Sequence, residues 1–541
     1  MKVETLALAA LGPFARLASG ASASWAGWGG GILNNHWAQS NTAISSSNVD
    51  SLTEHCKIPY PRGQYSPPTI LGNHAYYPTG NGSLVALNYK TCQVKWSVNV
   101  TKIVIDYKPV SPLQNIVQNG NTITRTSPQI DVANNVIFFG TQIHALIVAV
   151  DLSTGALLGT KQVNAHELAV VTSSPTFFND LVFVGASSNE ENAAFFTGGT
   201  YECCTFIGNA AAFRFRRTGS TGTFTTVWNV TTIPANLPKN GTQWSGAGIW
   251  GGQPSIDVGR RQVFFATGNI YSVPVEWYPC TVSNDPFCTP DYIWQESVFA
   301  VDMYTGQVNW VRRLNRLDAW TLVCGTPTLP INPALCPQTA PGADFDFGMA
   351  PTFVPGGKFT SRGKDMLTIG QKSGVLYGLA ADSGKVQWAT MVGPGNAVGG
   401  LVWGLAADDK RAYFNVVNFY QDDWVLQPGN TRHTNNSIHG AASLVDGSIA
   451  WETPTPYANM SYSIVPALVG DLYLTGLSGP FGFGSTAPGI VLAYKKTTGQ
   501  LVSQLALEGT FEGGISIQDE YVFVGTGRGG PGFLYVLKAG H

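Results

Sequence analysis

Aromatic side chains gather in five long stretches that interrupt the more regular apolar segments of this 541-residue sequence. The stretches are 189–204, 270–294, 318–347, 419–439 and 477–488. Aromatic rings on loops can stack on a flat or polycyclic apolar ligand. The alternative is that each ring only packs its loop onto the rest of the protein. For the set as a whole we expect the first, and therefore a site for a small hydrophobic or aromatic substrate.

Eight cysteines form a second group of residues with possible chemistry. Their spacing suggests the local pairs Cys56–Cys92, Cys280–Cys288 and Cys324–Cys336, while Cys203 and Cys204 are adjacent. The sequence contains no C-x-x-C, which argues against zinc or thioredoxin-like chemistry, and no C-x-x-C-H, the attachment signal of a c-type haem. An even number of paired cysteines indicates an oxidising compartment.

The elements that must position these residues repeat along the chain. Each copy has a Pro-containing start, two apolar strands separated by Gly, a T-G or S-G pair, and a strand that ends in Trp in most copies. Eight copies span residues 66–96, 127–155, 174–228, 253–310, 350–388, 412–451, 465–499 and 514–537. One such unit cannot bury both of its faces alone, so neighbouring units must stack.

This pattern predicts an all-β fold, an eight-bladed β-propeller, with seven blades as the alternative count. The eighth copy stops before its last strand, and the segment around residues 52–58 is expected to supply it and close the ring. We expect the repeated Trp to pack between blades. The predicted domains are 1–23, a signal peptide, and 24–541, a single propeller.

Composition and the N-terminal sequence indicate the compartment and exclude several partners. The signal peptide is predicted from Lys2, the apolar run 6–11 and an A-x-A pattern ending at Ala23. Six N-x-S/T sequons stand at Asn81, Asn99, Asn229, Asn240, Asn435 and Asn459. These features favour the secretory pathway or the extracellular space. A net charge of −2 and no long apolar run argue against nucleic acid and a membrane span, and we expect a monomer or simple homo-oligomer.

Eight short segments resemble the pyrroloquinoline quinone (PQQ) type of propeller, especially its polyvinyl-alcohol-dehydrogenase-like branch. They are SSNEE (187–191), CCTF (203–206), GIW (248–250), ATGN (266–269), LDAW (317–320), DFDFG (344–348), GQKSG (370–374) and GLVWG (400–404). The resemblance implies a vicinal disulfide, Cys203–Cys204, against the quinone. It also implies Ca²⁺ bound by Glu190 and Asn269, and Lys372 near the quinone oxygens.

These residue types suit such a ligand, but the sequence also departs from the family. An ortho-quinone with three carboxylates needs flat surfaces, cations and a hard metal with oxygen ligands. The family's alcohol dehydrogenases have a catalytic Asp shortly before the fourth blade's inner strand. In this sequence that stretch is 291–297, and whether Asp291 or Glu296 can serve is open. Without a haem, electrons would have to pass to an outside acceptor.

Two enzyme hypotheses and one binding hypothesis follow. The preferred one is a cyclase that needs no cofactor, because the chain is similar to the fungal hetero-Diels–Alder cyclases of tropolone sesquiterpenoid pathways in length, signal peptide, sequons and missing haem. Such an enzyme joins a tropolone quinone methide to a cyclic terpene alkene, and orientation supplies most of the acceleration. The alternative is an alcohol dehydrogenase with PQQ and Ca²⁺. The third is a non-catalytic binding propeller.

The candidate site residues are the same for both enzymes. Acid–base assistance is expected from Glu190, Lys372, Asp318 or His166, although His166 is more typical of a hydrogen-bonded structural histidine. Ligand binding is expected from Asn269, Tyr201, Trp250 and Trp403, with the three aromatic residues stacking. No metal ligand is assigned for the cyclase, and His36, His144 and His439 are too far apart in sequence to suggest one.

Overall fold

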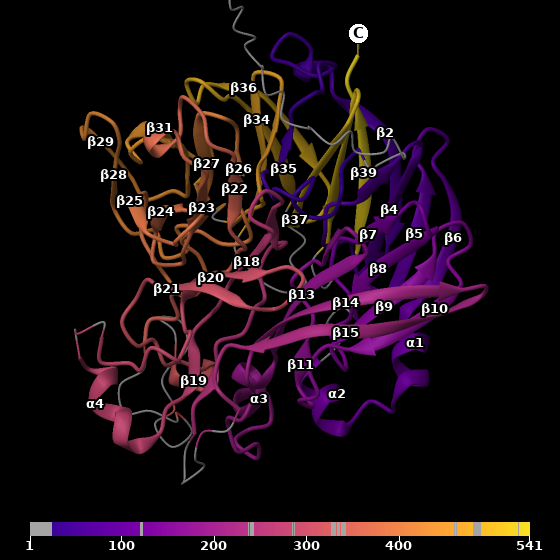
Figure 1. The fold of residues 1–541 in the computed structure, drawn as a ribbon. Helices are drawn as coiled ribbons and strands as arrows, with labels where there is room; N and C mark the ends of the chain where they lie inside the picture. Colours follow the sequence, from indigo (N-terminus) through magenta and orange to yellow (C-terminus); the bar gives the residue numbers. More distant parts are fainter. Residues whose placement is uncertain are drawn as a thin grey trace, which may run out of the picture.

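Eight sheets of at least four strands, one for each predicted repeat, form a ring in the computed structural model (Figure 1). The chain colours in Figure 1 run around this ring from indigo to yellow, so sequential repeats are spatial neighbours. The structure describes residues 24–118, 123–235, 237, 243–283, 285, 287–325, 332, 336, 342–458, 460, 462–479, 488–527 and 530–540. The predicted eight-bladed propeller is confirmed.

Each blade contributes four antiparallel strands, which are named in order from the hub outward. Blades 1 to 4 are β3 (Thr69–Leu71), β4 (His74–Thr79), β5 (Ser83–Asn88), β6 (Gln93–Asn99); β7 (Gln129–Asp131), β8 (Val136–Gly140), β9 (Leu146–Asp151), β10 (Leu157–Gln162); β12 (Thr176–Phe178), β13 (Leu181–Ser188), β14 (Asn209–Thr218), β15 (Thr221–Thr231); and β17 (Ser255–Asp257), β18 (Gln262–Ala266), β20 (Ser297–Asp302), β21 (Val308–Arg313). Blades 5 to 8 are β22 (Thr352–Val354), β23 (Met366–Gly370), β24 (Val375–Ala380), β25 (Val386–Met391); β26 (Ala406–Ala407), β27 (Arg411–Val416), β30 (Ile438–Ser443), β31 (Ile449–Pro454); β33 (Ala467–Val469), β34 (Leu472–Ser478), β35 (Gly489–Lys495), β36 (Leu501–Leu507); and β37 (Phe511–Gln518), β38 (Tyr521–Thr526), β39 (Gly532–Lys538), β2 (Thr53–Tyr60).

The repeated Trp and the T-G pair are two halves of one contact between neighbouring blades. Trp96 in blade 1 donates its indole N–H to the carbonyl of Leu152 in blade 2, and its ring lies against Gly155. A β-carbon on Gly155 would come within 2.8 Å of that ring, and φ there is +76°, so glycine is required. The same contact joins Trp228 to Gly306, Trp310 to Gly384, Trp388 to Gly447 and Trp451 to Gly499. The predicted packing between blades is confirmed.

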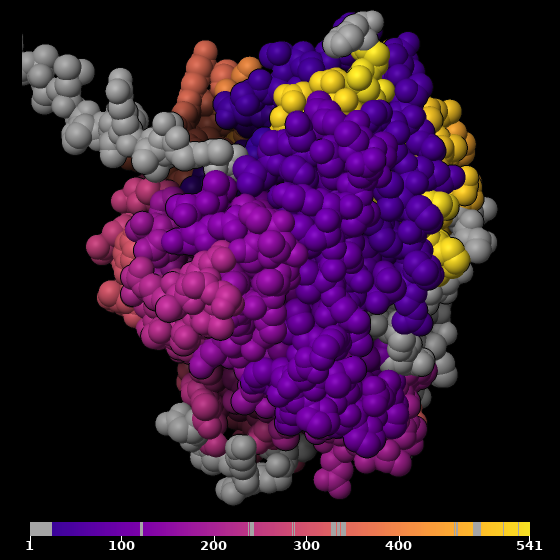
Figure 2. Space-filling model, turned by 90° about the vertical axis from the view of Figure 1, so that its right-hand side faces the viewer, coloured from indigo at the N-terminus to yellow at the C-terminus, as the bar shows by residue number. Residues whose placement is uncertain are grey.

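The two ends of the chain close the ring by sharing blade 8. Strand β2 pairs with β39 in antiparallel register from Thr53–Lys538 to Tyr60–Gly532, which confirms the closing strand predicted around residues 52–58. Figure 2 shows the yellow C-terminal residues packed beside the indigo N-terminal ones. A disulfide, Cys56–Cys92, joins this closing strand to blade 1.

The segment 24–38 runs through the hub, an arrangement that the sequence did not predict. Its backbone carbonyls accept hydrogen bonds from the inner strands: Ile32 from Ile256 of β17 and Leu33 from Phe353 of β22. Farther along, β1 (Trp37–Ala38) pairs in parallel with β33. Because one segment contacts several blades in turn, it fills the channel and ties the inner strands together.

Loop insertions carry the remaining elements, and several gather along the lower edge of Figure 1. The helices are α1 (Val100–Tyr107), α2 (Pro112–Gln118), α3 (Glu190–Phe196) and α4 (Tyr278–Thr281), with short 3-10 turns η1 (Val49–Ser51), η2 (Val275–Trp277), η3 (Leu322–Cys324) and η4 (Ser361–Gly363). Short added strands are β11 (Ala169–Val170), β16 (Ser245–Gly246), β19 (Ile270–Ser272), β28 (Trp424–Leu426), β29 (Arg432–Thr434) and β32 (Tyr462–Ser463). In the described part of the chain, no helix is both long and apolar enough to cross a bilayer.

All four expected disulfides form, including the adjacent pair. Besides Cys56–Cys92 they are Cys203–Cys204, Cys280–Cys288 and Cys324–Cys336. Four disulfides in one chain are consistent with an oxidising compartment.

Candidate active site

The polar candidates converge because equivalent strand ends face the same side of a propeller. In an antiparallel blade, the end of the second strand and the start of the inner strand share one edge. Asn269 follows β18 and Lys372 follows β23, both second strands. Asp344, Asp346 and Trp250 precede inner strands, β22 and β17. The strand order therefore brings residues more than a hundred positions apart in the sequence to one face of the propeller.

A buried lysine stands at the centre of this face. The Nζ atom of Lys372 lies 3.0 Å from Oδ2 of Asp344 and 3.0 Å from Oδ2 of Asp346. It also lies 5.3 Å from the centre of the Trp250 ring, a cation–π contact. Burial alone would lower the pKa of Lys372, but Asp344, Asp346 and Glu191 raise it well above its usual value. Lys372 is therefore an ammonium ion at neutral pH.

Hydrogen bonds from the backbone fix the carboxylates around Lys372. Asp318 accepts the N–H groups of Asp344 at 3.1 Å and Phe345 at 2.6 Å. Asp346 accepts the N–H of Asn269 at 2.6 Å on Oδ1, and the indole N–H of Trp250 at 3.0 Å on Oδ2. A rigid set of oxygens is thus built without any contribution from a ligand.

This cluster contains more carboxyl groups than one lysine can balance. Burial, together with Asp346 and Asp318, raises the pKa of Glu191 to about 8 even though Lys372 opposes the shift. Burial also raises the pKa of Asp344 well above its usual value. Within the described residues, Oδ1 of Asp344 is buried and has no hydrogen-bond partner. A group of buried and half-buried carboxyl groups with an unpaired oxygen is typical of a site that binds a cation or a hydrogen-bond donor.

Glu296 borders the cluster, whereas Asp291 lies outside it. Glu296 is buried, its Oε2 accepts hydrogen bonds from Asn315 and Gln371, and burial together with Asp318 raises its pKa well above the usual value. Asp291 is fully exposed and pairs with Arg313. The strand that follows them, β20, is the third strand of blade 4 and not its inner strand, so the strand assigned to this stretch from the sequence was wrong.

Glu190 lies in a separate network, although it is adjacent to Glu191. Its Oε1 accepts the Tyr201 hydroxyl at 2.6 Å and the Thr205 N–H at 2.6 Å, and Oε2 accepts the Phe206 N–H at 2.8 Å. Burial alone would raise the pKa of Glu190, but hydrogen bonds from His166, Tyr201 and Phe206 lower it. Glu190 is a saturated carboxylate that holds the loop containing the Cys203–Cys204 disulfide.

The position of His166 explains why it belongs to the same network. Nδ1 accepts the backbone N–H of Leu168 at 3.2 Å, so the ring proton is on Nε2. Nε2 lies 3.0 Å from the Thr205 hydroxyl and 3.4 Å from Oε1 of Glu190. His166 therefore donates to the network that holds the disulfide loop, the structural role that was the more typical expectation. We refer to Glu190, His166, Tyr201 and Thr205 as the clamp.

Trp250 and Trp403 meet at the hub beneath the cluster. Their rings pack edge to face, with centres 5.4 Å apart, and the guanidinium of Arg125 lies 4.9 Å from the Trp403 ring. Trp28, from the hub segment, donates its indole N–H to the carbonyl of Trp403. They line a narrow cavity with room for about one water molecule. These hub residues therefore lie beneath the cluster and bound the candidate site on that side.

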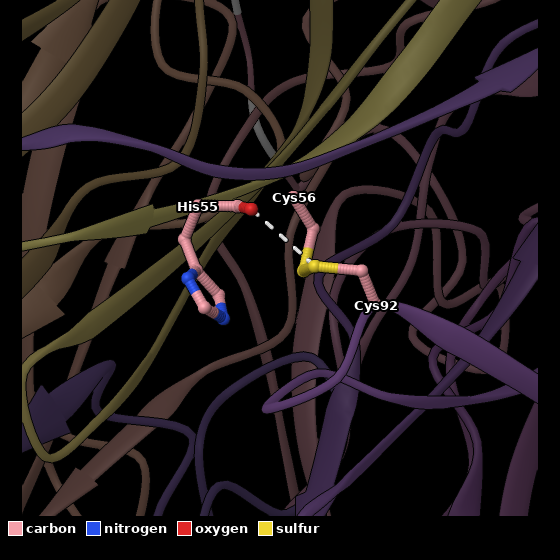
Figure 3. Close-up of side chains that lie close together, drawn as sticks. All are labelled: His55, Cys56 and Cys92. Atoms are coloured by element: carbon pink, nitrogen blue, oxygen red, sulfur yellow. Dashed lines mark hydrogen bonds between the residues drawn. A yellow bond between two sulfur atoms is a disulfide. The ribbon is translucent and has the colours of Figure 1, made fainter.

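One group of potential metal ligands elsewhere is explained by a disulfide. His55, Cys56 and Cys92 lie close enough to hold an ion, and they are the single such group of His, Cys, Asp and Glu found within the described ranges. Figure 3 shows the two sulfur atoms bonded to each other, with the His55 ring beside them. Sulfur in a disulfide is not a thiolate and does not ligate a metal in this way.

The structure thus divides the predicted residues into two groups. Lys372, Asp318, Asn269, Trp250 and Trp403 come together at the cluster or its floor. Glu190, His166 and Tyr201 form the clamp.

Sequence reasoning missed the roles of three acids, Glu191, Asp344 and Asp346. Two of them had a detectable signal, because acids that alternate with aromatic residues in DFDFG are unusual in an apolar, buried segment.

The fold and this charged site define a class: an eight-bladed propeller with a cluster of acidic side chains around a buried lysine on one face. The sequence model for "Glucose/ethanol/alcohol dehydrogenase, beta-propeller domain" matches residues 25–330, more than half of the chain. The chain belongs to this PQQ-type propeller family. A second model, "Outer membrane protein assembly factor BamB", matches residues 294–508.

Two relatives carry the name polyvinylalcohol dehydrogenase. The one from Pseudomonas sp. is 27% identical over 528 residues, 94% of this chain and 73% of that protein. The one from Sphingopyxis sp. (strain 113P3) is 29% identical over 412 residues, 73% of this chain and 55% of that protein. The chain therefore spans about three quarters or less of the length of these relatives.

Solved structures confirm the fold at low sequence identity. The quinohemoprotein alcohol dehydrogenase from Comamonas testosteroni superposes with a TM-score of 0.66 at 14% identity, covering 95% of this chain and 80% of that one. A europium-containing methanol dehydrogenase superposes with a TM-score of 0.64 at 15% identity, covering 95% and 98%. At this identity the likeness concerns the fold.

Proposed function

We propose that this protein is an alcohol oxidoreductase that uses PQQ and a hard cation such as Ca²⁺. The observation that carries the proposal is the surplus of buried carboxylates around Lys372, beside the Trp250 ring. A site for two apolar reactants does not need four acids and an ammonium ion, because burying charged groups without a charged ligand is costly. A polyanionic quinone and a divalent cation together use both signs of charge.

The residues present fit these two groups. Asn269 uses its Nδ2 to bind the Trp320 carbonyl at 2.8 Å, which leaves Oδ1 without a donor among the described residues. This oxygen and the Glu191 carboxylate are the hard ligands that Ca²⁺ prefers. Lys372 would hold an anionic oxygen of the quinone, and Trp250 offers a flat surface. When bound, the quinone supplies the two-electron acceptor that alcohol oxidation requires.

Glu191 takes the ligand role that the family resemblance gave to Glu190. Glu190 has both oxygens occupied by Tyr201, Thr205 and Phe206, so binding Ca²⁺ would break at least one of these bonds. Asp346, Lys372 and Asp318 all shift the pKa of Glu191, so its carboxyl group lies near the cluster. The Glu191 side chain is only partly buried.

Asp344 is the residue we propose as the base for the alcohol proton. Its Oδ1 is free, and burial raises its pKa, so its carboxylate takes up a proton more readily than an exposed one. Asp318, by contrast, is occupied by two backbone N–H groups that belong to the same loop as Asp344. We assign Asp318 to holding that loop in position.

The relatives' names suggest a substrate class, secondary alcohols, with polyvinyl alcohol as the polymer to test. Alcohol oxidation by this protein would need an external electron acceptor, since the sequence contains no C-x-x-C-H for an attached haem. We also propose that residues 1–23 are removed as a signal peptide and that 24–541 form one secreted propeller.

The cyclase stays a prediction that no observation in the described site favours. Its two reactants carry no charge that would use Lys372 and the surrounding acids, and both curated relatives are named dehydrogenases. A binding propeller without catalysis likewise leaves the free Oδ1 of Asp344 without a role.

One experiment separates the three. The purified protein is titrated with PQQ and Ca²⁺, bound quinone absorbance is recorded, and dye reduction is followed with 2-propanol and with polyvinyl alcohol. We expect binding and reduction in the wild type, loss of both in Lys372→Met, and binding without reduction in Asp344→Asn. Absence of PQQ binding, together with a changed product ratio when a quinone-methide precursor and a cyclic alkene are mixed, would establish the cyclase instead.

A further inference from the structure

A wide groove on the outside of the ring lies between the outer strands of blades 2 and 3, β10 and β15. Its volume is about 730 Å³, within the roughly 300–1000 Å³ typical of a small-molecule site. Figure 1 shows β10 and β15 side by side at this edge of the molecule. Half of the lining residues are Thr, Asn or Gln, the rest include apolar side chains, and Tyr107 of α1 adds one exposed aromatic ring. Such a mixed surface suits a sugar, which has both hydroxyl groups and apolar ring faces.

Asn229, an asparagine of an N-V-T sequon, lines this groove from β15. A row of three asparagines fixes its orientation: Asn164 donates to Oδ1 of Asn209 at 2.7 Å, and Asn209 donates to Oδ1 of Asn229 at 2.7 Å. Asn209 is buried and also binds the Val163 carbonyl. With Oδ1 held against Asn209, the Nδ2 atom of exposed Asn229 has no acceptor among the described residues and is free to carry a substituent.

We propose that Asn229 carries an N-linked glycan and that the groove between β10 and β15 seats its first sugars. In the transfer, Nδ2 of Asn229 forms a bond to C1 of the first sugar of a lipid-linked oligosaccharide. The bond from C1 to the phosphate oxygen breaks, the lipid pyrophosphate leaves, and Nδ2 loses one proton. The proposal goes beyond the redox function and rests only on the proposed secretory route.

The groove supplies partners for those sugars. Thr226 and Thr231 flank Asn229 on the same strand, and Thr160 and Gln162 face them from β10. Each offers a donor or an acceptor to a sugar hydroxyl.

A second N-V-T sequon, at Asn99, offers a matched control. Asn99 also lies on an outer strand, as the last residue of β6, and is also exposed, but it lies outside the groove and its Oδ1 caps α1 through the N–H of Lys102. The N-V-T triplet is the same at both asparagines, so a difference between them reports their surroundings. A glycan at Asn99 should extend into solvent, and a glycan at Asn229 should be sheltered.

The test uses the full chain secreted from yeast. Peptide mass spectrometry measures glycan at Asn229 and Asn99, and the release of each glycan by an endoglycosidase is timed in folded and in denatured protein. We expect glycan at Asn229 that is released at least tenfold more slowly from folded than from denatured protein, and a smaller ratio at Asn99. An unmodified Asn229, or equal release rates from folded and denatured protein, would overturn the proposal.

A chemical probe checks the position of the sugar independently of the enzyme. Lys161 lines the groove, so a seated glycan should slow its acylation by an amine-reactive ester. Thr231→Ala removes the sequon but keeps Asn229, and we expect acylation of Lys161 to become at least threefold faster. Thr231→Ser keeps the sequon, and Thr101→Ala removes only the Asn99 glycan, so both should leave the Lys161 rate unchanged. An unchanged rate in Thr231→Ala would place the glycan outside the groove.

Discussion

Replacing Glu190 and Glu191 separately by glutamine tests the division of the site into clamp and cluster. Glu190→Gln keeps one oxygen, which can still accept from Tyr201 and Thr205, but turns an NH₂ group toward the N–H of Phe206. An orphaned buried N–H costs about 1–3 kcal/mol, and the loss of charge weakens the remaining bonds. We therefore expect the free energy of unfolding to fall by about 3 kcal/mol.

The expected thermal shift is small because the protein is large. With about 2.1 cal/mol/K of unfolding entropy per residue over 541 residues, a loss of about 3 kcal/mol lowers Tm by roughly 3 °C. The loss should be concentrated around residues 201–206, where hydrogen exchange would speed up first. Cation affinity should stay within a factor of about two, because Glu190 contributes no free oxygen.

Glu191→Gln should behave in the opposite way. The folded-state pKa of Glu191, about 8, lies above the ordinary value of 4.5, so its contribution to stability is present below pH 4.5 and is lost as pH rises to about 8. Without added cation, the variant should therefore be more stable than wild type at pH 8, by about 2 kcal/mol after allowance for partial exposure. Its affinity for Ca²⁺ should fall by at least tenfold.

The assay is isothermal titration with Ca²⁺ at pH 6, 7, 8 and 9, paired with thermal unfolding in chelator. In wild type, Ca²⁺ must displace a proton from Glu191, so affinity should rise with pH up to about 8 and then level off. Glu191→Gln should lose this slope, and Glu190→Gln should keep it. If Glu190→Gln lost the cation while Glu191→Gln bound it as wild type does, the assignment of ligand and clamp would be reversed.

Three further predictions concern other parts of the structure. The double variant Cys56→Ser, Cys92→Ser should lower the free energy of unfolding by about 4 kcal/mol in denaturant titrations, because that disulfide spans 36 positions. Loss of the Cys280–Cys288 disulfide, which spans 8 positions, should cost less, about 2.5 kcal/mol. An equal loss in both variants would argue against pairing of β2 as the critical closure of the ring. Asn269→Ala should weaken Ca²⁺ binding at least tenfold while circular dichroism stays unchanged, and full affinity would remove Oδ1 from the ligand set. Burial raises the pKa of Glu452, which accepts a hydrogen bond from Trp424, to about 7. The stability that Glu452 gives the β28–β29 hairpin should therefore be lost as pH rises through 7. Proteolysis of residues 424–434 should be faster above pH 7 in wild type, and this increase should be absent in Glu452→Gln.

The ring could be predicted from sequence because its contacts repeat. Each Trp contacts the T-G turn at a similar position in the following repeat, as Trp96 contacts Gly155. The same Trp and Gly therefore recur in the sequence of several repeats. The incomplete eighth repeat exposed the need for β2. The hub segment 24–38 left no such mark, because it binds the inner strands largely through backbone carbonyls, which any residue supplies.

The sequence predicted which face of the propeller carries the candidate site, but it did not predict which atoms there are free to bind a ligand. Strand order alone brings Asn269 and Lys372 to one edge, and family resemblance names them, but neither tells which oxygen of a neighbouring acid is free. Glu190 and Glu191 begin the same helix, α3, and successive helical residues point about 100° apart. One of the two must therefore face the disulfide loop and the other the cluster, and the choice depends on the direction in which α3 leaves β13. That direction is set by packing against the described neighbours α2 and η3, which lie far away in sequence, so local sequence could not assign the roles. The Glu190→Gln and Glu191→Gln variants test this orientation of the helix. The first should lower the free energy of unfolding, and the second should lower the affinity for Ca²⁺.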